Sequence, residues 1–558
     1  MIKQTGAELT IALLERQGIT RIAGIPGGTN LPLYDALSRS RIRHVLARHE
    51  QGAGFIAQGM ARATGRPAVC FATSGPGATN LLTALADAKL DSIPVICITG
   101  QVPLALIGSD AFQEVDIYGM SLPVTKHNFL IRSGEELLEV IPEAFRIATS
   151  GRPGPVLIDI PKDVQQTEVE FPQWPEPGIA ATPQAASSES IAAAAGAIKM
   201  AERPILYLGG GVVHAGGAEL ARTFAQHCGL PTAMTLMALG SLAHNHPLSL
   251  GMLGMHGAEA TNHALQRSDL LIAVGARFDD RATGKVADFC PRAKVIHLDI
   301  DASELHKLRR ADYPLAGDLV PTLAALLEQL PPQSREAWLD EVMALKSTYP
   351  AATLGTGISR PKDLIQIVAD ILGDDTIVTT DVGQHQMWTA QIYPLSRPRQ
   401  WLTSGGLGTM GFGLPAAIGA ALAEPQRPVV CFSGDGSILM NVQELATAAE
   451  LNLNIKLVLL NNSALGLVRQ QQDLFYGGNR VASDLGHNPD FCAVARGFGW
   501  PTLDLAEAGR GIEPLAAALR SPGPQFIHAP IDGGARVYPM VPPGGANYQM
   551  LTGERYEQ

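Results

Sequence analysis

Short apolar segments recur along the chain between longer segments with amphipathic, helical patterns. The short segments are apolar at consecutive positions, and many are rich in Val and Ile. This pattern is typical of strands buried on both faces, as in parallel sheets covered by helices. Their alternation with helical segments predicts an α/β fold. The segments that we predict as strands are 67–72, 93–99, 155–160, 205–208, 270–274, 295–298, 377–380, 428–432, 455–460 and 525–528.

Two segments rich in proline and small residues interrupt this alternation. The first, 171–190, reads FPQWPEPGIAATPQAASSES; the second, 329–360, has prolines and a Gly-Thr-Gly stretch around a helical pattern. At about 150 residues a domain, a chain of this length holds three to four domains. We predict three, each a mostly parallel sheet flanked by helices, at 1–170, 190–335 and 360–535. A tail rich in proline and glycine follows at 536–558.

Residues 70–100 and 431–462 share one order of features: a strand, a Ser-Gly-x-Gly turn, a helix and a second strand. Either the two outer domains share a fold, or two ordinary α/β units resemble each other by chance. The sequence alone leaves both interpretations open.

The composition is that of an ordinary globular protein, 46% apolar and 17% charged. The formal net charge is −11 without a long run of Lys or Arg, so we expect no nucleic-acid partner. The apolar segments are too short to span a bilayer, and the N-terminus has no signal-peptide pattern. Six cysteines are scattered without a CxxC pair, and Cys70, Cys97 and Cys431 fall in predicted strands. We therefore expect buried, reduced thiols in a cytoplasmic protein.

Asp435 and Asn462 each follow a predicted strand of the third domain. Asp435 lies in a Gly-Asp-Gly-Ser turn, and Asn462 ends an Asn-Asn pair after the next strand. The carboxyl ends of neighbouring parallel strands are where open α/β sheets bind ligands. A carboxylate and an amide carbonyl suit Mg²⁺. Gly434 and Gly436 let backbone amides approach a diphosphate, and the helix N-terminus behind them favours that anion. The alternative is a structural Asp-Gly turn, which is common.

Two further loops of this domain offer groups to the same anion. Gln384 and His385 follow the predicted strand 377–380, although a polar pair there also occurs as ordinary hydrogen-bonded side chains. The glycine-rich segment 405–413 includes Gly408 and Met410, whose soft side chain suits a bent cofactor. The alternative for this segment is a helix entry that requires small residues.

The Gly-Asp-Gly turn and the Asn-Asn pair together resemble the cofactor motif of thiamine-diphosphate enzymes. Glu50, in the segment RHEQGA, matches the position of the family's activating glutamate. Without the resemblance, a glutamate in a first helical turn would only complement the helix dipole. In the family these sites meet across a subunit interface, so the resemblance implies a homodimer or a larger assembly.

Almost the whole chain resembles the catalytic subunits of acetolactate synthase. Those enzymes decarboxylate pyruvate on thiamine diphosphate and join the two-carbon unit to pyruvate or 2-ketobutyrate. The products lead to valine, leucine and isoleucine, and a small regulatory subunit usually accompanies the catalytic one. The matching stretches include GIPGGTNLPLYDAL (24–37), TSGPGATNL (73–81), IGSDAFQE (107–114), GARFDDR (275–281), TDVGQHQMW (380–388), SGGLGTMGFGLPAAIGA (404–420) and NVQEL (441–445).

The resemblance implies a role for each matching position. Glu50 activates the cofactor, while Asp435, Asn462 and the backbone carbonyl of Ala464 bind Mg²⁺. The positions implied to contact thiamine diphosphate are Glu50, Gln384, His385, Gly408, Met410, Asp435, Gly436, Ser437 and Asn462. The positions implied near the substrate are Phe112, Gln113, Lys162 and Gln471, of which Gln113 and Lys162 also count as catalytic.

The middle domain matches the FAD-binding region of the same family, in which FAD takes no net redox part. Glycine turns after strands suit a dinucleotide, and Arg277 suits its phosphates. The charged run 279–281 has an alternative as a surface ion-pair loop. The positions implied to contact FAD are Arg152, Gly209, Gly210, Gly211, Thr235, Leu236, Met237, Met255, His256, Gly275, Ala276, Arg277, Asp299, Ile300 and Asp318.

Gln471 departs from the pattern of many family members, which carry Trp at this position. That Trp favours the bulkier 2-ketobutyrate as second substrate. With Gln471 we expect weak discrimination, prominent acetolactate formation and lower sensitivity to inhibitors that stack on the Trp. Members with this pattern form an isozyme group, to which the chain is similar.

Two kinds of rival remain open at this point. One is another thiamine enzyme: a pyruvate oxidase with redox-active FAD, an acetolactate synthase without FAD, or a glyoxylate carboligase, which lacks the glutamate present here as Glu50. The other is a non-catalytic regulatory homologue that has kept the fold, against which Glu50, Asp435 and Asn462 argue.

Overall fold

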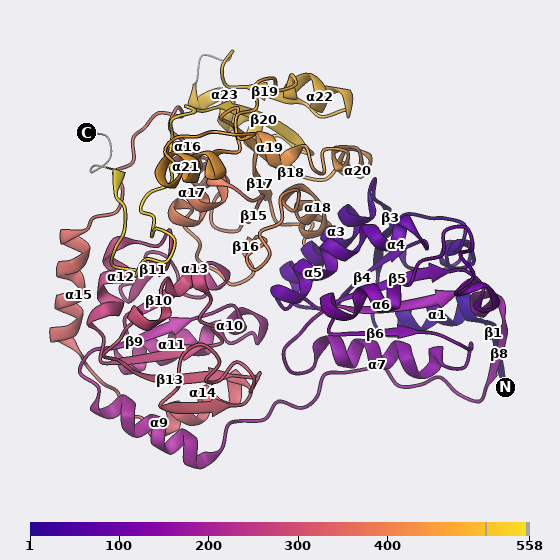
Figure 1. Ribbon diagram of the computed structural model, residues 1–558, viewed down its shortest axis with the longest axis horizontal. Helices are drawn as coiled ribbons and strands as arrows, with labels where there is room; N and C mark the ends of the chain where they lie inside the picture. The colour runs from indigo at the N-terminus through magenta and orange to yellow at the C-terminus, as the bar shows by residue number, and fades with distance from the viewer. Residues whose placement is uncertain (508–510, 554–558) are drawn as a thin grey trace.

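Three six-stranded sheets, one for each consecutive third of the chain, form the framework of the protein (Figure 1). The computed structural model describes residues 1–507 and 511–553. All described strand pairs within these sheets are parallel and helices flank each sheet, which confirms the predicted fold class. Each sheet falls inside one of the predicted domain ranges, whose boundaries remain predictions.

The two outer sheets have the same strand order, so the shared pattern of 70–100 and 431–462 reflects a shared fold. The N-terminal order is β3 (Arg43–Leu46), β2 (Arg21–Gly24), β4 (Ala68–Ala72), β5 (Val95–Gln101), β7 (Val156–Pro161) and β6 (His127–Leu130). The C-terminal order is β16 (Trp401–Leu402), β15 (Ile377–Thr380), β17 (Val429–Gly434), β18 (Ile455–Asn461), β20 (Gln525–Pro530) and β19 (Thr502–Asp504).

The middle sheet has a different order, the one found in dinucleotide-binding folds. It runs β11 (Ser249–Met252), β10 (Thr232–Met234), β9 (Pro204–Leu208), β12 (Leu270–Val274), β13 (Lys294–Asp299) and β14 (Tyr313–Ala316). A small antiparallel pair, β1 (Ile2–Thr5) with β8 (Glu168–Phe171), closes the first domain.

The helices lie in the same three groups. The first domain has α1 (Gly6–Arg16), α2 (Leu31–Ser38), α3 (Glu50–Thr64), α4 (Pro76–Asn80), α5 (Leu82–Leu90), α6 (Ile117–Ser121), α7 (Leu137–Thr149) and α8 (Lys162–Gln166). The middle domain has α9 (Ser188–Met200), α10 (Gly211–His214), α11 (Ala218–Cys228), α12 (Glu259–Arg267), α13 (Asp280–Thr283), α14 (Leu319–Gln329) and α15 (Glu336–Thr348). The third has α16 (Pro361–Leu372), α17 (Gln384–Ile392), α18 (Gly413–Ala423), α19 (Asp435–Ile438), α20 (Glu444–Glu450), α21 (Gly466–Phe475), α22 (Phe491–Gly497) and α23 (Ile512–Arg520).

All ten predicted segments form strands, with ends displaced by no more than a few residues. The prediction omitted short strands such as β2, β6 and β16, because few apolar residues stand together there. Residues 172–187 carry no helix or strand, as expected of a linker. All six cysteines are buried and free, as predicted. None of the helices in the described ranges has the length and apolarity that crossing a bilayer requires.

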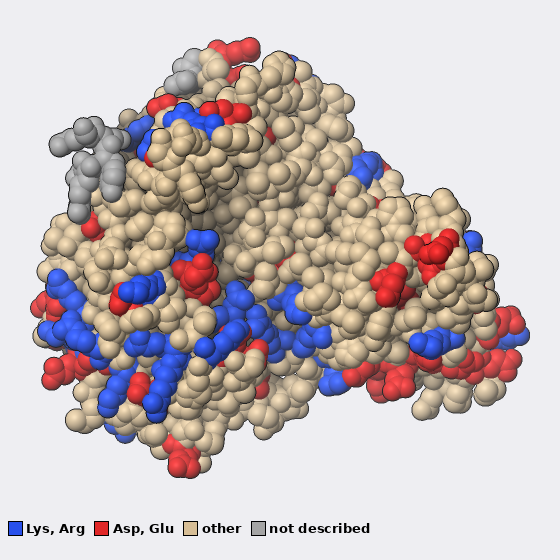
Figure 2. All heavy atoms as spheres, viewed as in Figure 1, with Lys and Arg blue, Asp and Glu red and all other residues tan. Residues whose placement is uncertain are grey.

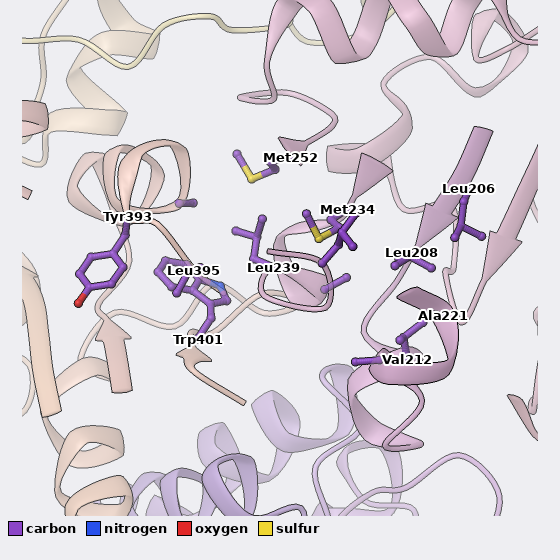
Figure 3. Packing of buried hydrophobic residues seen from close by; sticks show 14 of the residues in the cluster. Leu206, Leu208, Val212, Ala221, Met234, Leu239, Met252, Tyr393, Leu395 and Trp401 are labelled. Carbon is purple, nitrogen blue, oxygen red and sulfur yellow. The ribbon is translucent and has the colours of Figure 1, made fainter. Parts of the chain in front are cut away.

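The hydrophobic cores join the domains. Buried side chains of the middle sheet, such as Leu208 and Met252, belong to one cluster with Leu395 and Trp401 of the third domain (Figure 3). A second cluster joins α3 of the first domain to α18 of the third, and the two helices lie side by side in Figure 1. The domains are therefore fixed to one another by shared apolar cores.

Gly59 lets α3 approach α18 closely, because a Cβ at this position would collide with the backbone carbonyl of Ala416. Replacing Gly59 with Ala is expected to destabilise the fold by about 1–3 kcal/mol, since the Ala416 carbonyl can move away only if the backbone of α18 shifts. The measurement is the midpoint of thermal unfolding. The control is Gly196→Ala in α9, where a Cβ meets nothing within 4 Å. Unchanged midpoints for both variants would contradict the close packing.

Candidate active site

Asp435 and Asn462 lie at the carboxyl ends of two neighbouring strands, as predicted. Gly434 at the end of β17 pairs with Leu460 of β18. Oδ2 of Asp435 accepts a 2.8 Å hydrogen bond from the Asn488 amide, and Nδ2 of Asn462 donates to Oε1 of Gln384 at 3.0 Å. Burial raises the pKa of the Asp435 carboxyl. The side-chain partner described for this buried carboxylate is a neutral amide, so a bound cation would supply the missing charge.

Gln384 and His385 face this pair from the start of α17. The order of the sheet reverses between β15 and β17, which is the usual ligand-binding point of an open α/β sheet. Burial lowers the pKa of His385 to about 3, so the ring is neutral, and its Nε2 has no partner among the described residues. A Cβ on Gly434 would lie 2.8 Å from Nδ1 of His385, which explains the glycine.

The glycine-rich loop approaches the same turn. The amide of Gly411 donates to the buried carboxylate of Asp381 at 2.7 Å, and Oγ of Ser437 donates to the Val382 carbonyl at 2.8 Å. A Cβ on Gly436 would lie 3.8 Å from Cε of Met410. The third domain thus brings its predicted thiamine residues to one edge of its sheet.

Glu50 lies at the corresponding edge of the first domain, in the first turn of α3. Its Oε2 accepts a 2.9 Å hydrogen bond from Asn80, and a Cβ on Gly77 would lie 3.2 Å from its Oε1. Gln113, with a positive φ of 60°, packs against Gly75, which directly precedes α4. This arrangement brings Gln113 and Glu50 to one glycine turn.

Phe112 and Lys162, the other positions implied near the substrate in this domain, have no contact described with Glu50. Phe112 is 88% exposed, and Lys162 begins α8 directly after β7. The hydrogen bond described for Glu50 stays within the first domain, while those of Asp435 and Asn462 stay within the third. Within one chain, the side-chain hydrogen bonds described for Glu50, Asp435 and Asn462 themselves therefore do not join Glu50 to the other two residues.

Glu444 is a residue whose role the sequence did not reveal, although it lies in the matching stretch NVQEL. Its fully buried carboxylate accepts hydrogen bonds from the backbone amides of Arg48 at 2.8 Å and His49 at 3.0 Å. Burial raises the pKa of this carboxyl. Glu444 therefore anchors the start of the helix that carries Glu50. Its only sequence signal is a carboxylate in an otherwise apolar helical pattern.

A cavity of about 720 Å³ lies where the domains meet, and all fifteen residues implied to contact FAD line it. Gly408 and Gln471 line it as well. Gly209–Gly211 and Gly275–Arg277 follow β9 and β12, between which the strand order of the middle sheet reverses. A Cβ on Gly211 would lie 2.7 Å from Cα of Gly275, so these turns require glycine. The visible face is hollowed between the domains, with Lys and Arg beside the hollow (Figure 2).

The charges of this cavity divide into paired and unpaired groups. Arg152 forms an ion pair with Glu304 at 2.9 Å, whereas Arg277 has no ion pair among the described residues. Burial raises the pKa of Asp299 to about 6. In the run 279–281, Asp279 caps α13, while Asp280 and Arg281 form an exposed pair at 3.6 Å. The alternative of a surface ion-pair loop therefore holds for Asp280 and Arg281. Both residues also line the cavity.

A buried ionic network holds the glycine-rich loop against the first domain. Nη2 of Arg62 lies 2.8 Å from Asp91 and 3.1 Å from Asp87. The Asp91 carboxylate accepts hydrogen bonds from the amides of Gly405 and Gly406 at 3.0 and 2.7 Å. The loop is thereby fixed between the cavity and the thiamine residues.

Replacing Arg62 with Met is expected to lower the free energy of unfolding by about 3–5 kcal/mol, because two buried carboxylates lose their cation. Thermal unfolding measures the loss. The control is Arg39→Met, whose ion pair with Asp35 is exposed, so a change of no more than about 1 kcal/mol is expected. Equal effects of the two substitutions would contradict a stabilising role of the network.

Three family models match consecutive segments: the N-terminal TPP binding domain of thiamine pyrophosphate enzymes over 4–120, the central domain over 191–326 and the C-terminal TPP binding domain over 381–529. The acetolactate synthase isozyme 1 large subunit of Escherichia coli K12 is 57% identical over 98% of this chain and 97% of its own length. The isozyme 2 large subunit of the same organism is 48% identical over 98% and 99%.

A plant relative shows how widely the similarity extends. Acetolactate synthase 3, chloroplastic, of Brassica napus is 43% identical over 98% of this chain and 86% of its own length. The similarity thus covers all three sheets and both halves of the predicted site. The chain belongs to the acetolactate synthase large-subunit family of thiamine-diphosphate enzymes.

Proposed function

We propose that the chain decarboxylates pyruvate and joins the two-carbon unit to a second 2-keto acid. With pyruvate as acceptor the product is 2-acetolactate, and with 2-ketobutyrate it is 2-aceto-2-hydroxybutyrate. The observation that carries the proposal is the pair of intact half-sites, Glu50 on one outer sheet and Asp435 with Asn462 on the other. Thiamine diphosphate, when bound, supplies the nucleophilic carbon that attacks the keto acid.

The donor set at the end of β17 fits Mg²⁺. Asp435 offers a carboxylate oxygen and Asn462 an amide carbonyl, both hard ligands of the kind this ion takes. The raised pKa of buried Asp435 is expected without a cation and falls when one binds. Ala464, whose amide also supports the Asp435 carboxylate, lies beside them and is the third proposed ligand, through its carbonyl.

In one chain the side-chain hydrogen bonds of Glu50 and of Asp435 stay within separate domains, which supports a homodimer with sites shared between subunits. Glu50 of one chain would then act beside Asp435 of another. Apolar side chains near both half-sites are exposed in the single chain: Phe112 at 88% and Met440 at 51%. Large exposed apolar groups beside an incomplete site favour coverage by a partner.

The cavity between the domains fits FAD in a non-redox role. The reversal of strand order at β9 and β12 and the glycine turns there suit a dinucleotide, and Arg277 provides a cation for its phosphates. If the flavin instead served an oxidase, pyruvate would reduce it under anaerobic conditions. Retention of the yellow absorbance during turnover without oxygen supports the carboligase over the oxidase.

Gln471 lies in the wall of the same cavity and is proposed to face the acceptor keto acid. Replacing Gln471 with Trp is expected to raise the preference for 2-ketobutyrate over pyruvate by about 10–200-fold, the value of one well-packed methylene. Competition between the two acids, with both products quantified, measures this preference. A wild-type enzyme that already strongly favours 2-ketobutyrate would contradict the weak discrimination proposed for Gln471.

A small regulatory subunit and cytoplasmic residence are the remaining proposals and rest on the family alone. The proposed reaction is tested by a colorimetric acetolactate assay on purified protein, with thiamine diphosphate, Mg²⁺ and FAD each omitted in turn. Formation of acetolactate that depends on all three supports the proposal. A protein that binds the cofactors without turnover would favour the non-catalytic homologue.

A further inference from the structure

A line of polar side chains leads from Asp435 across the third domain to its last edge strand. Nδ2 of Asn488 donates to Oδ2 of Asp435 at 2.8 Å and to Oδ1 of Asn461 at 3.2 Å. Nδ2 of Asn461 lies 3.0 Å from Nε2 of His528, whose Nδ1 lies 3.1 Å from Oδ2 of Asp504. Beyond Asp435 itself, these residues come from β18, β20, β19 and the loop before α22.

One backbone amide fixes the direction of every hydrogen bond in this line. The N–H of Ser463 donates to Oδ1 of Asn461 at 3.0 Å, so that oxygen must be the acceptor. Nδ2 of Asn461 then faces the ring of His528 as a donor, and Nε2 of His528 must accept. A neutral ring consequently carries its proton on Nδ1, where it points at the carboxylate of Asp504.

The same reasoning fixes Asn488. Because Oδ1 of Asn461 accepts, the group of Asn488 that faces it is the amide nitrogen, and this nitrogen also reaches Asp435. The carboxylate of Asp435 is therefore held by an amide whose own orientation depends on Asn461. His528 and Asp504 hold Asn461 from the other side.

We propose that His528 and Asp504 are positioning residues for the metal-binding carboxylate of Asp435, acting through Asn461 and Asn488. The inference rests on the proposed Mg²⁺ site. Partners that orient a metal ligand from outside contribute about 10–100-fold to metal affinity. Removal of the His528 acceptor leaves Nδ2 of Asn461 without a partner, and the Asn461 side chain is then held through Oδ1 alone, so Asn488 and Asp435 are oriented less firmly.

Cys492 offers a competing interpretation. Its Sγ and the ligand atoms of Asp504 and His528 lie within 4.8 Å of one another, a spacing that a transition metal accepts. Both ring nitrogens of His528 are already engaged within the chain, however. The described contacts thus favour the positioning role over a second metal site.

The test compares Mn²⁺ binding, followed by electron paramagnetic resonance, to the thiamine-diphosphate-loaded wild type and to variants. His528→Leu removes the acceptor and is expected to weaken Mn²⁺ binding by about 10–100-fold. His528→Gln restores an acceptor and is expected to recover most of the affinity. Asp504→Asn, on the short edge strand β19, is also expected to weaken Mn²⁺ binding. This variant tests the positioning role if His528→Leu does not fold.

Asp435→Asn serves as the reference that separates the two proposals. If Asp435→Asn binds Mn²⁺ like the wild type, the metal site itself is misplaced. If Asp435→Asn loses Mn²⁺ while His528→Leu and Asp504→Asn keep it, the positioning role is overturned. A stoichiometric transition metal that is present in the purified enzyme and lost in Cys492→Ala would also overturn it.

Discussion

Replacing Glu50 with Gln is expected to lower kcat by about 10²–10⁴-fold, the range typical for loss of a general acid–base group. The substitution keeps the size of the side chain and an oxygen that accepts from Asn80, so the helix start stays intact. It removes the charge proposed to activate the cofactor. Steady-state acetolactate formation at saturating pyruvate and cofactors measures the effect.

The matched control is Glu189→Gln, because Glu189 also lies in the first turn of a helix, α9, far from either half-site in sequence. Its activity is expected to equal that of the wild type. Thermal unfolding shows whether Glu50→Gln remains folded. Wild-type turnover by folded Glu50→Gln would show that Glu50 does not activate the cofactor.

Replacing Asp435 with Asn is expected to weaken Mg²⁺-dependent binding of thiamine diphosphate by more than about 100-fold. Loss of a residue that only hydrogen-bonds a metal ligand lowers metal affinity by up to about 100-fold. The effect is expected to be larger here, because a direct ligand loses its charge. Calorimetric titration of the cofactor at several Mg²⁺ concentrations measures the affinity. Undiminished binding by the variant would show that another carboxylate holds the ion.

The raised pKa of Asp435 gives this variant a second, opposite signature. A carboxyl whose pKa is higher in the folded than in the unfolded state favours folding when protonated, and this contribution is lost as the pH rises through the raised pKa. Without Mg²⁺, the Asn variant at neutral pH should therefore unfold at the same temperature as the wild type or higher. With Mg²⁺ and cofactor the order should reverse.

The strands were predictable because buried parallel strands are apolar at every position, and the predicted segments coincide with strands such as β12 and β15. Asp435 and Asn462 were predictable because they follow two such strands directly. Short strands like β6 carry too few apolar residues to be recognised. The sequence does not indicate which strands are neighbours, so the equal strand order of the outer sheets follows only from pairings such as β2 with β4 and β15 with β17.

The supporting residues were not predictable for a different reason. Asn488 lies in a loop, and its contact with Asp435 joins positions without any periodic relation. Glu444 reaches the start of α3 from another domain, so no local pattern indicates its partner. The tail at 536–553 also has no regular pattern, yet Val541 donates its amide to Met255 and Pro539 accepts from His256, so the tail packs on the middle domain.

The central claim is that the two half-sites make acetolactate from pyruvate. It is tested most directly by supplying carbon-13 pyruvate to the purified protein with thiamine diphosphate, Mg²⁺ and FAD, and following the products by NMR. The account predicts 2-acetolactate and carbon dioxide in equal amounts, with no net consumption of oxygen. Acetate, acetaldehyde or peroxide in place of acetolactate would contradict it.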